Sequence, residues 1–342
     1  MILAIDLGGT EVKIGLVDGE GRVRAKTAES VAFDGYRTPI LDTTIRAAER
    51  FLAEQGCPVE GIAVSACGQI DPESGTVIGT NGKIPHYEGV SLKAELEKKF
   101  GKETWVLNDA NAAALGEGFA GRARGLKDVI LVTLGTGVGG GVITGGRLLG
   151  GRRGIAGELG HFTLRQDGPA CPCGKRGCWE HYASTTALVA RCEKASGRTG
   201  LNGKVIFREA EAGDPVFRRE LEGWISDIAA GLTGLIHIFN PEMVLIGGGV
   251  SAQEEMLIRP LREKVMAEAM PRFTEKLRIE RAMLGNDAGM IGAAGFWLER
   301  QSKKRSERGQ SLSPCANNET RAVRKPVRLL RLEAAERKEN DY

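Results

Sequence analysis

Two stretches of the chain, ILAIDLGGTEVKIGLV at residues 2–17 and VILVTLGTGVGGGVITGGRL at residues 129–148, share one pattern and decide the fold. Each starts with an apolar run typical of a buried strand, bends at glycine and threonine, and continues as a second strand. Such a repeat predicts two domains of like topology, each presenting a glycine bend to one cleft. Backbone amides that converge at such bends can bind phosphate.

The pattern between and beyond these stretches predicts a mixed α/β chain. We expect helices over residues 38–55, 91–100, 215–239 and 289–299, and strands over residues 22–25, 61–65, 104–107 and 243–246. A third glycine bend follows the last of these strands at residues 247–249. Beyond residue 300 the pattern fails, so we expect a chain that ends near Arg300 to keep full activity.

The composition excludes several classes of protein. The 342 residues suit two domains, and a net charge of +3 gives no sign of a nucleic-acid partner. No apolar run is long enough to cross a membrane, and the N-terminus lacks the features of a signal peptide. We therefore expect a cytoplasmic protein without membrane or nucleic-acid partners.

Residues 301–342 differ from the rest in charge, with eleven basic and six acidic side chains. RNA binding is one interpretation, but no aromatic residue interleaves these charges before Tyr342. We predict a basic, disordered tail.

The three glycine bends are the candidate nucleotide site. Its residues are Asp6, Gly8, Gly9, Thr10, Lys13, Gly135, Thr136, Gly137, Gly247, Gly248 and Gly249. A single bend of this kind is a plain hairpin turn about as often as it is a phosphate site. Three such bends at strand ends suit the β-phosphate, the γ-phosphate and the adenosine of ATP. Asp6 can hold Mg²⁺ through water. Lys13 lies near the phosphates or points outward from its strand. No bend matches a Walker A loop or a dinucleotide-binding fingerprint.

The strongest local signal is the pair of segments ELGH at residues 158–161 and CPCGKRGCWE at residues 171–180. They give the spacing His-x9-Cys-x-Cys-x4-Cys, and we predict a closed, structural Zn²⁺ site formed by His161, Cys171, Cys173 and Cys178. Glycines within the segment supply the turns of a tight knuckle. Incidental cysteines are the disfavoured alternative, and disulfides are not expected in a reducing compartment.

Together these motifs resemble the actin-like ATPase superfamily and, within it, the ROK family of bacterial repressors, open-reading-frame proteins and sugar kinases. The resemblance covers about residues 1–300. It implies an α/β fold of two ribonuclease-H-like domains around a central cleft, with a zinc loop at residues 161–178. It divides the chain into residues 1–115, closed by the helix near residues 289–299, and residues 116–288. A homodimer is implied as well.

The resemblance also implies ATP-dependent phosphorylation of a hexose, with glucose 6-phosphate as the first expected product. N-acetylmannosamine, N-acetylglucosamine, fructose, mannose and β-glucosides stay open as substrates, and so does the preference for ATP over another phosphoryl donor. By the match of residues 108–117, NDANAAALGE, Asp109 is the general base. A carboxylate there can take the proton of the attacking hydroxyl. A plain N-cap role is the alternative for Asp109, although Asn108 or Asn111 could cap that helix equally well.

The same resemblance implies the sugar ligands, which are Gly68, Gln69, Asn81, Asn108, Asp109, Glu158, His161 and Glu180. His161 would bind zinc through one ring nitrogen and a sugar hydroxyl through the other. The loops at residues 66–72 and 80–87 match more loosely, with Cys67-Gly68 where family members often have Gly-Pro or Pro-Gly. The identity of the sugar is open for this reason.

Three other functions compete with the kinase. A repressor of the family carries a helix-turn-helix domain ahead of this fold, and we expect none because the first phosphate strand starts at Ile2. A non-catalytic sugar-responsive regulator would lack the base or the glycine bends. An actin-like filament or chaperone would lack the zinc loop. The candidate base, the glycine bends and the zinc loop are all present in the sequence.

Overall fold

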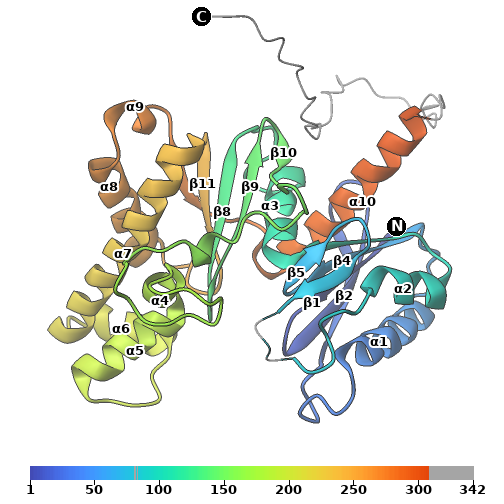
Figure 1. Ribbon diagram of the computed structural model, residues 1–342, viewed down its shortest axis with the longest axis horizontal. Coiled ribbons are helices and arrows are strands. Elements are labelled where there is room, and N and C mark those ends of the chain that lie inside the picture. The colour runs from blue at the N-terminus through green and yellow to red at the C-terminus, as the bar shows by residue number, and fades with distance from the viewer. Residues whose placement is uncertain (81, 83, 308–342) are drawn as a thin grey trace, which may run out of the picture.

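The structure is a computed structural model that describes residues 1–80, 82 and 84–307. It has two lobes, each built on a five-stranded sheet (Figure 1). The first sheet has the order β3-β2-β1-β4-β7, formed by Val23–Ser30, Glu11–Val17, Ile2–Leu7, Gly61–Ala66 and Thr104–Asn108. The second has the order β10-β9-β8-β11-β12, formed by Arg147–Leu148, Val138–Thr144, Val129–Leu134, Met243–Gly247 and Arg278–Arg281. A separate hairpin consists of β5 (Gln69–Asp71) and β6 (Thr76–Gly79).

The two sheets repeat one topology, which confirms the predicted repeat. In the first sheet β1 pairs antiparallel with β2 and parallel with β4, and β4 pairs parallel with β7. In the second sheet β8 pairs antiparallel with β9 and parallel with β11, and β11 pairs parallel with β12. The predicted α/β class is also confirmed.

The predicted helices form within two residues of their expected starts. The α-helices are α1 (Ile40–Gln55), α2 (Leu92–Phe100), α3 (Asp109–Phe119), α4 (Glu180–Ala183), α5 (Thr185–Ser196), α6 (Gly203–Glu211), α7 (Pro215–Phe239), α8 (Arg259–Glu268), α9 (Pro271–Thr274) and α10 (Ala288–Glu307). Shorter helical turns are η1 (Leu159–His161), η2 (Glu254–Ile258) and η3 (Gly285–Asp287). Local caps fix their ends: Ser91 accepts a hydrogen bond from the amide of Ala94, and Gly56 ends α1 in the left-handed region. In the described part of the chain, none of these helices has both the length and the apolar character that crossing a membrane requires.

Helix α10 packs on the first sheet, while α3 lies between α10 and the second sheet. The buried face of α10 contacts β1, β4 and β7. A side chain at Gly116 would clash with the carbonyl of Ala288, and one at Gly292 would clash with the carbonyl of Ala112. The two helices therefore touch backbone to backbone. The boundary expected after residue 115 cuts through α3 and stays a prediction.

The end of α10 corrects one expectation. We expected the helix to end near residue 299 and a disordered tail to start at residue 301, but α10 continues to Glu307. Gln301 and Lys304 both donate hydrogen bonds to Glu103, beside the edge strand β7. Burial alone would raise the pKa of Glu103, but these hydrogen bonds outweigh it and hold the pKa below its ordinary value. Apolar periodicity does not reveal the end of this helix, because residues 301–307 are polar and dock through charge. The remainder of the predicted tail, residues 308–342, lies outside the described residues.

A truncation tests this docking. A chain ending at Glu307 is expected to keep the stability of the full chain. A chain ending at Arg300 should have a free energy of unfolding about 1–2 kcal/mol lower, because it loses two partly exposed contacts to Glu103. Both should keep turnover, since these contacts are remote from the cleft. Urea denaturation of the three chains measures the difference. Equal stability of all three would show that residues 301–307 do not stabilise the fold.

Candidate functional site

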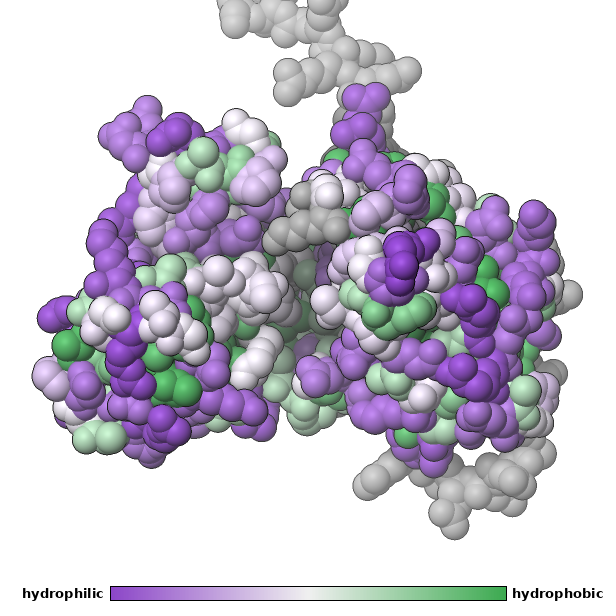
Figure 2. All heavy atoms as spheres, turned by 90° about the horizontal axis from the view of Figure 1, so that it is seen from below, coloured by the Kyte–Doolittle hydropathy of each residue, from purple (hydrophilic) through white to green (hydrophobic). Residues whose placement is uncertain are grey.

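The first half of the site lies at the carboxyl ends of three parallel strands. The register pairs Asp6 of β1 with Ser65 of β4, and Ala66 of β4 with Asn108 of β7. Because parallel strands end at the same edge of a sheet, Asp6 and the start of α3 lie close together. Figure 2 shows the two lobes with a recess between them.

Asn108 is the N-cap of α3, which leaves Asp109 available for chemistry. The Oδ1 of Asn108 accepts hydrogen bonds from the amides of Ala110 (3.0 Å) and Asn111 (3.1 Å). Its Nδ2 donates to the carbonyl of Gly68 (3.0 Å) and to Oδ1 of Asp109 (2.9 Å). The plain capping alternative for Asp109 is thus unnecessary. A direct contact between Asn108 and a sugar stays a prediction, since its amide already has four partners.

The carboxylate of Asp109 is anchored through one oxygen. Its Oδ1 accepts from the amide of Ala110 (2.8 Å) as well as from Asn108, while Oδ2 accepts no hydrogen bond from any described residue. Its side chain is exposed to water but has protein on several sides, and desolvation is the main cause that raises its pKa to about 6. The charges of Asp6 and Glu158 add to this increase. Those two carboxylates belong to opposite lobes, so Asp109 lies between them.

The first glycine bend is held from both sides of β1. The amide of Gly8 donates to the carbonyl of Glu11 (3.0 Å). Asp6 has both oxygens engaged: Oδ1 accepts from Ser65 Oγ (2.7 Å) and Oδ2 pairs with Lys13 Nζ (3.1 Å). Lys13 therefore lies beside the bend and points to Asp6. Whether it also contacts a phosphate stays a prediction.

The second bend is tied to α4 and α5, the helices that follow the zinc loop. The amide of Gly135 donates to the carbonyl of Gly137 (3.0 Å), and Thr186 at the start of α5 donates its hydroxyl to the carbonyl of Thr136 (2.8 Å). Glu180 Oε2 accepts from the amide of Val138 (3.0 Å). The predicted sugar ligand Glu180 thus fixes the predicted phosphate bend with one oxygen.

The third bend packs directly on the end of β8. Gly248 has a φ of +90°, and a side chain there would clash with the carbonyl of Leu134. The last residue of β11, Gly247, is buried, whereas Gly248 and Gly249 are exposed. The second and third bends therefore meet at one edge of the second sheet, as the first bend meets α3 at the edge of the first sheet.

The four predicted metal ligands come together. One donor atom from each of His161, Cys171, Cys173 and Cys178 lies within 4.8 Å of the others. The distance from His161 Nδ1 to Cys171 Sγ is 3.6 Å, and that from Cys173 Sγ to Cys178 Sγ is 3.5 Å. Tetrahedral zinc with ordinary bond lengths has ligand-to-ligand distances of about 3.5–3.8 Å. The cluster is therefore compatible with a zinc site.

The zinc loop is fastened to the second lobe by buried groups. Trp179 is fully buried and donates from its indole to the carbonyl of Asp227 (2.9 Å). The carboxylate of Asp227 pairs with Arg165 of the loop and with Arg191 of α5 (2.6 Å). These contacts fix the base of the loop, so its metal cluster has a rigid support.

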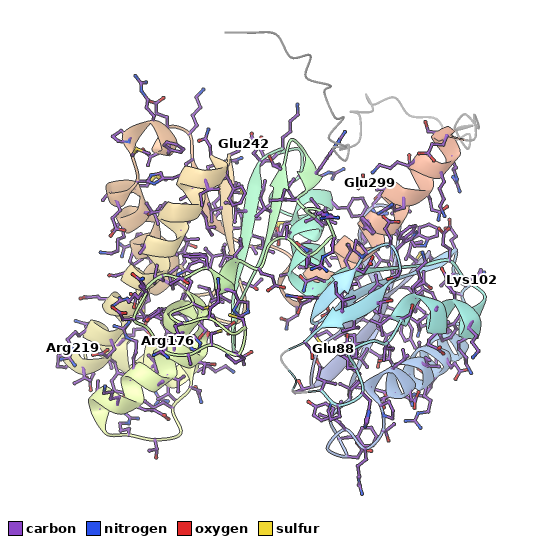
Figure 3. The ribbon with its side chains drawn as sticks, in the orientation of Figure 1. Glu88, Lys102, Arg176, Arg219, Glu242 and Glu299 are labelled. Carbon is purple, nitrogen blue, oxygen red and sulfur yellow. The ribbon has the colours of Figure 1, made fainter. Side chains whose placement is uncertain are left out.

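The remaining predicted sugar residues come from both lobes. Gly68 has a φ of +94°, and its carbonyl accepts a hydrogen bond from the side-chain amide of Asn108. Gln69 is the first residue of the small hairpin. Glu158 is exposed, and Asn81 lies outside the described residues. Figure 3 shows Glu88, which follows the Asn81 loop, on the first lobe and Arg176 of the zinc loop on the second.

Two residues of the site escaped the sequence analysis. Ser65 binds Asp6, and its signal was a single hydroxyl inside the apolar run GIAVSA. Gly289 lies against both, since a side chain there would come within 2.8 Å of Asp6 Oδ1 and 2.7 Å of Ser65 Oγ. No local pattern marks Gly289, because its contact partners are more than 200 residues away.

Comparisons with known proteins agree with this geometry. The ROK family model matches residues 2–300. The glucokinase of Thermotoga maritima is 36% identical over 87% of this chain and 98% of its own length. The beta-glucoside kinase of Listeria innocua is 34% identical over 88% of this chain and 99% of its own.

A solved structure adds the fold. The ROK family glucokinase of Streptomyces griseus, in complex with glucose and AMPPNP, superposes with a TM-score of 0.74 at 34% identity. The match covers 86% of this chain and 98% of that one. The two lobes described above therefore have the arrangement of a known sugar kinase.

Proposed function

Because the chain belongs to the ROK family, we propose that it is an ATP-dependent kinase that transfers the γ-phosphoryl group to glucose. Its glucokinase and β-glucoside kinase relatives match along nearly their whole length, and this makes it a sugar kinase. One observation carries the proposed mechanism. Asp109 lies between the lobes with one oxygen anchored and the other without a partner among the described residues.

In the proposed reaction a sugar hydroxyl donates a hydrogen bond to Oδ2 of Asp109. Its oxygen attacks the γ-phosphorus, the bond from that phosphorus to the bridging oxygen of ADP breaks, and the hydroxyl proton passes to Asp109. Within the two bends, the amides of Gly8 and Gly135 are already used by Glu11 and Gly137. The remaining amides, those of Gly9, Thr10, Thr136 and Gly137, stabilise the charge on the transferred group. Mg²⁺, when bound, would neutralise phosphate charge, and Asp6 is the residue that would hold it through water.

The sugar ligands are proposed from the geometry around the zinc cluster. Because His161 faces Cys171 through Nδ1, its Nε2 remains for a sugar hydroxyl. Glu180 binds Val138 through Oε2, which leaves Oε1. Glu158 is exposed and near enough to Asp109 for its charge to raise the pKa of that carboxyl. Acceptors of this kind select for substrates that carry hydroxyls at matching positions. A bound zinc would hold His161 directly and would fix the positions of Glu158 and Glu180, which lie next to its loop in the sequence.

A β-glucoside is the second candidate substrate. The Listeria innocua enzyme that carries this activity in its name is nearly as similar to this chain as the glucokinase is. The loop at Cys67-Gly68, which departs from the family pattern, contacts the cap of α3 through the carbonyl of Gly68. The homodimer and the preference for ATP over other phosphoryl donors also belong to this proposal.

Release of ADP with different sugars tests the proposed function. We expect sugar-dependent turnover with kcat/KM highest for glucose, because the glucokinase of Thermotoga maritima is 36% identical to this chain and the beta-glucoside kinase of Listeria innocua 34%. The panel contains glucose, mannose, fructose, N-acetylmannosamine, N-acetylglucosamine and a β-glucoside, with a sugar-free reaction as the control. A higher kcat/KM for the β-glucoside would assign the β-glucoside, in place of glucose, as the substrate. ADP release that no sugar stimulates would refute the kinase.

A further inference from the structure

The side-chain amide of Asn111 has a role that the mechanism above leaves out. Asn111 lies two residues after Asp109 on α3 and is 3% exposed. Its Oδ1 is buried and has no hydrogen-bond partner among the described residues. Buried amide oxygens are nearly always paired, since leaving one unpaired is costly. An unpaired one beside a catalytic candidate points to a partner that arrives in another state of the enzyme.

The backbone of Gly157 passes close to this oxygen. A side chain at Gly157 would place its first carbon 3.2 Å from Oδ1 of Asn111 and 3.3 Å from the carbonyl of Gly140. Gly157 has a φ of +102°, which side-chain-bearing residues rarely adopt. The absence of a side chain lets the segment pass directly over the buried amide. Glu158, a proposed sugar ligand, is the next residue.

This segment has donors that match the unused acceptor. The amide of Ala156 donates to Gly150 (3.2 Å), that of Leu159 to Gly157 (2.7 Å), and that of His161 to Glu158 (3.1 Å). Within the described part of the chain, the intervening amides of Gly157 and Glu158 have no acceptor. Two unused donors and one buried, unused acceptor therefore lie at the same place.

We propose that Asn111 is a positioning residue: when sugar is bound, its Oδ1 accepts a hydrogen bond from a backbone amide of Gly157 or Glu158. A change in the backbone torsion angles of Gly157 allows this hydrogen bond to form, and it holds the carboxylate of Glu158 in position to bind the sugar. The proton acceptor Asp109 and the sugar ligand Glu158 come from different lobes, and Asn111 connects them in the bound state. The inference rests on the proposed sugar kinase function and deepens it.

The substitution Asn111→Leu removes the acceptor and keeps the volume. KM for the sugar should rise about tenfold, the effect of one lost hydrogen bond to a buried group, with kcat within about threefold of wild type. The melting temperature of the sugar-free protein should not fall, because an unpaired polar atom is removed. A structural role alone would instead lower the melting temperature and leave KM unchanged. That outcome would overturn the proposal.

Thr43→Val is the matched control. The hydroxyl of Thr43 on α1 is also buried without a partner among the described residues, and this variant makes the same kind of change away from the cleft. It should leave KM for the sugar unchanged. An equal rise in KM for both variants would show that the effect is not specific to Asn111 and would count against the proposal.

Hydrogen exchange of the wild-type protein provides a second test that does not depend on how the variant folds. Glucose should slow amide exchange in residues 157–158 at least about tenfold, and Asn111→Leu should lose this protection. If calorimetry shows that wild type binds glucose but glucose does not slow the exchange of these amides, the inference is overturned and the proposed kinase function is not affected. Protection with no turnover would support the inference and refute the kinase. Absence of any sugar binding would overturn both.

Discussion

Asp109→Asn is expected to lower kcat at least about 100-fold while sugar and ATP bind within about tenfold of wild type. The amide keeps the size of the side chain and can still hydrogen-bond to the amide of Ala110. It cannot accept the hydroxyl proton. Most of the rate in phosphoryl transfer comes from in-line positioning and charge stabilisation, so the loss is limited to the share of the base.

The pH profile of wild type gives a second measure of the same role. The acceptor form of Asp109 is the deprotonated one, and its pKa is raised to about 6. Turnover should therefore fall as the pH drops through about 6 and be constant above it. Residual turnover of Asp109→Asn should not show this decrease, because the titrating group is gone. The same decrease in both proteins would assign the pKa to another group.

Glu158→Gln is the control for Asp109→Asn. It removes one negative charge from the same cleft, but from a proposed hydroxyl ligand on the other lobe, so the loss should appear mainly as a raised KM for sugar. Steady-state kinetics of both variants separate the two roles. A near-normal kcat for Asp109→Asn would move the base elsewhere and leave Asp109 as an exposed residue in the first turn of α3.

Cys173→Ser should remove zinc and weaken sugar binding together. Cys173 is exposed whereas Cys171 and Cys178 are buried, so this substitution removes a ligand without opening the core. We expect less than about 0.2 zinc per chain and a rise in KM for sugar of at least about 100-fold, since groups that orient a metal site typically contribute 10–100-fold and a direct ligand contributes more. His161 belongs to this cluster and Glu180 follows it by two residues, so both lose their fixed positions.

Cys57→Ser is the matched control for zinc. Cys57 lies on the first lobe, outside the metal cluster, and the one hydrogen bond of its thiol to a described residue goes to the carbonyl of Pro58. Elemental analysis should find one zinc per chain in this variant and in wild type. Wild type purified without chelators that holds no zinc would refute the metal site. Loss of zinc with unchanged sugar KM would show that the loop does not position the sugar ligands.

Much of the fold could be predicted because its signals are local. The glycine bend between β1 and β2 and that between β8 and β9 predicted the two sheets, and helical spacing of apolar residues predicted α1, α2, α7 and the first part of α10. The helices α4, α5, α6, α8 and α9 were not predicted. The last turns of α10 were missed as well, because they dock by charge on Glu103 and carry no apolar stripe.

The sequence by itself left the cap of α3 open among Asn108, Asp109 and Asn111, but it predicted the cluster of four candidate zinc ligands. His161 and the three cysteines lie within 18 residues, and the loop that joins them has few ways to fold around a metal, so spacing alone was sufficient. Only the tertiary structure decided that Glu180 holds the amide of Val138, that Ser65 holds Asp6, and that Gly157 crosses Asn111. These partners are separated by 42, 59 and 46 residues. No local propensity encodes such contacts, because they form only when packed sheets and helices bring distant strand ends together.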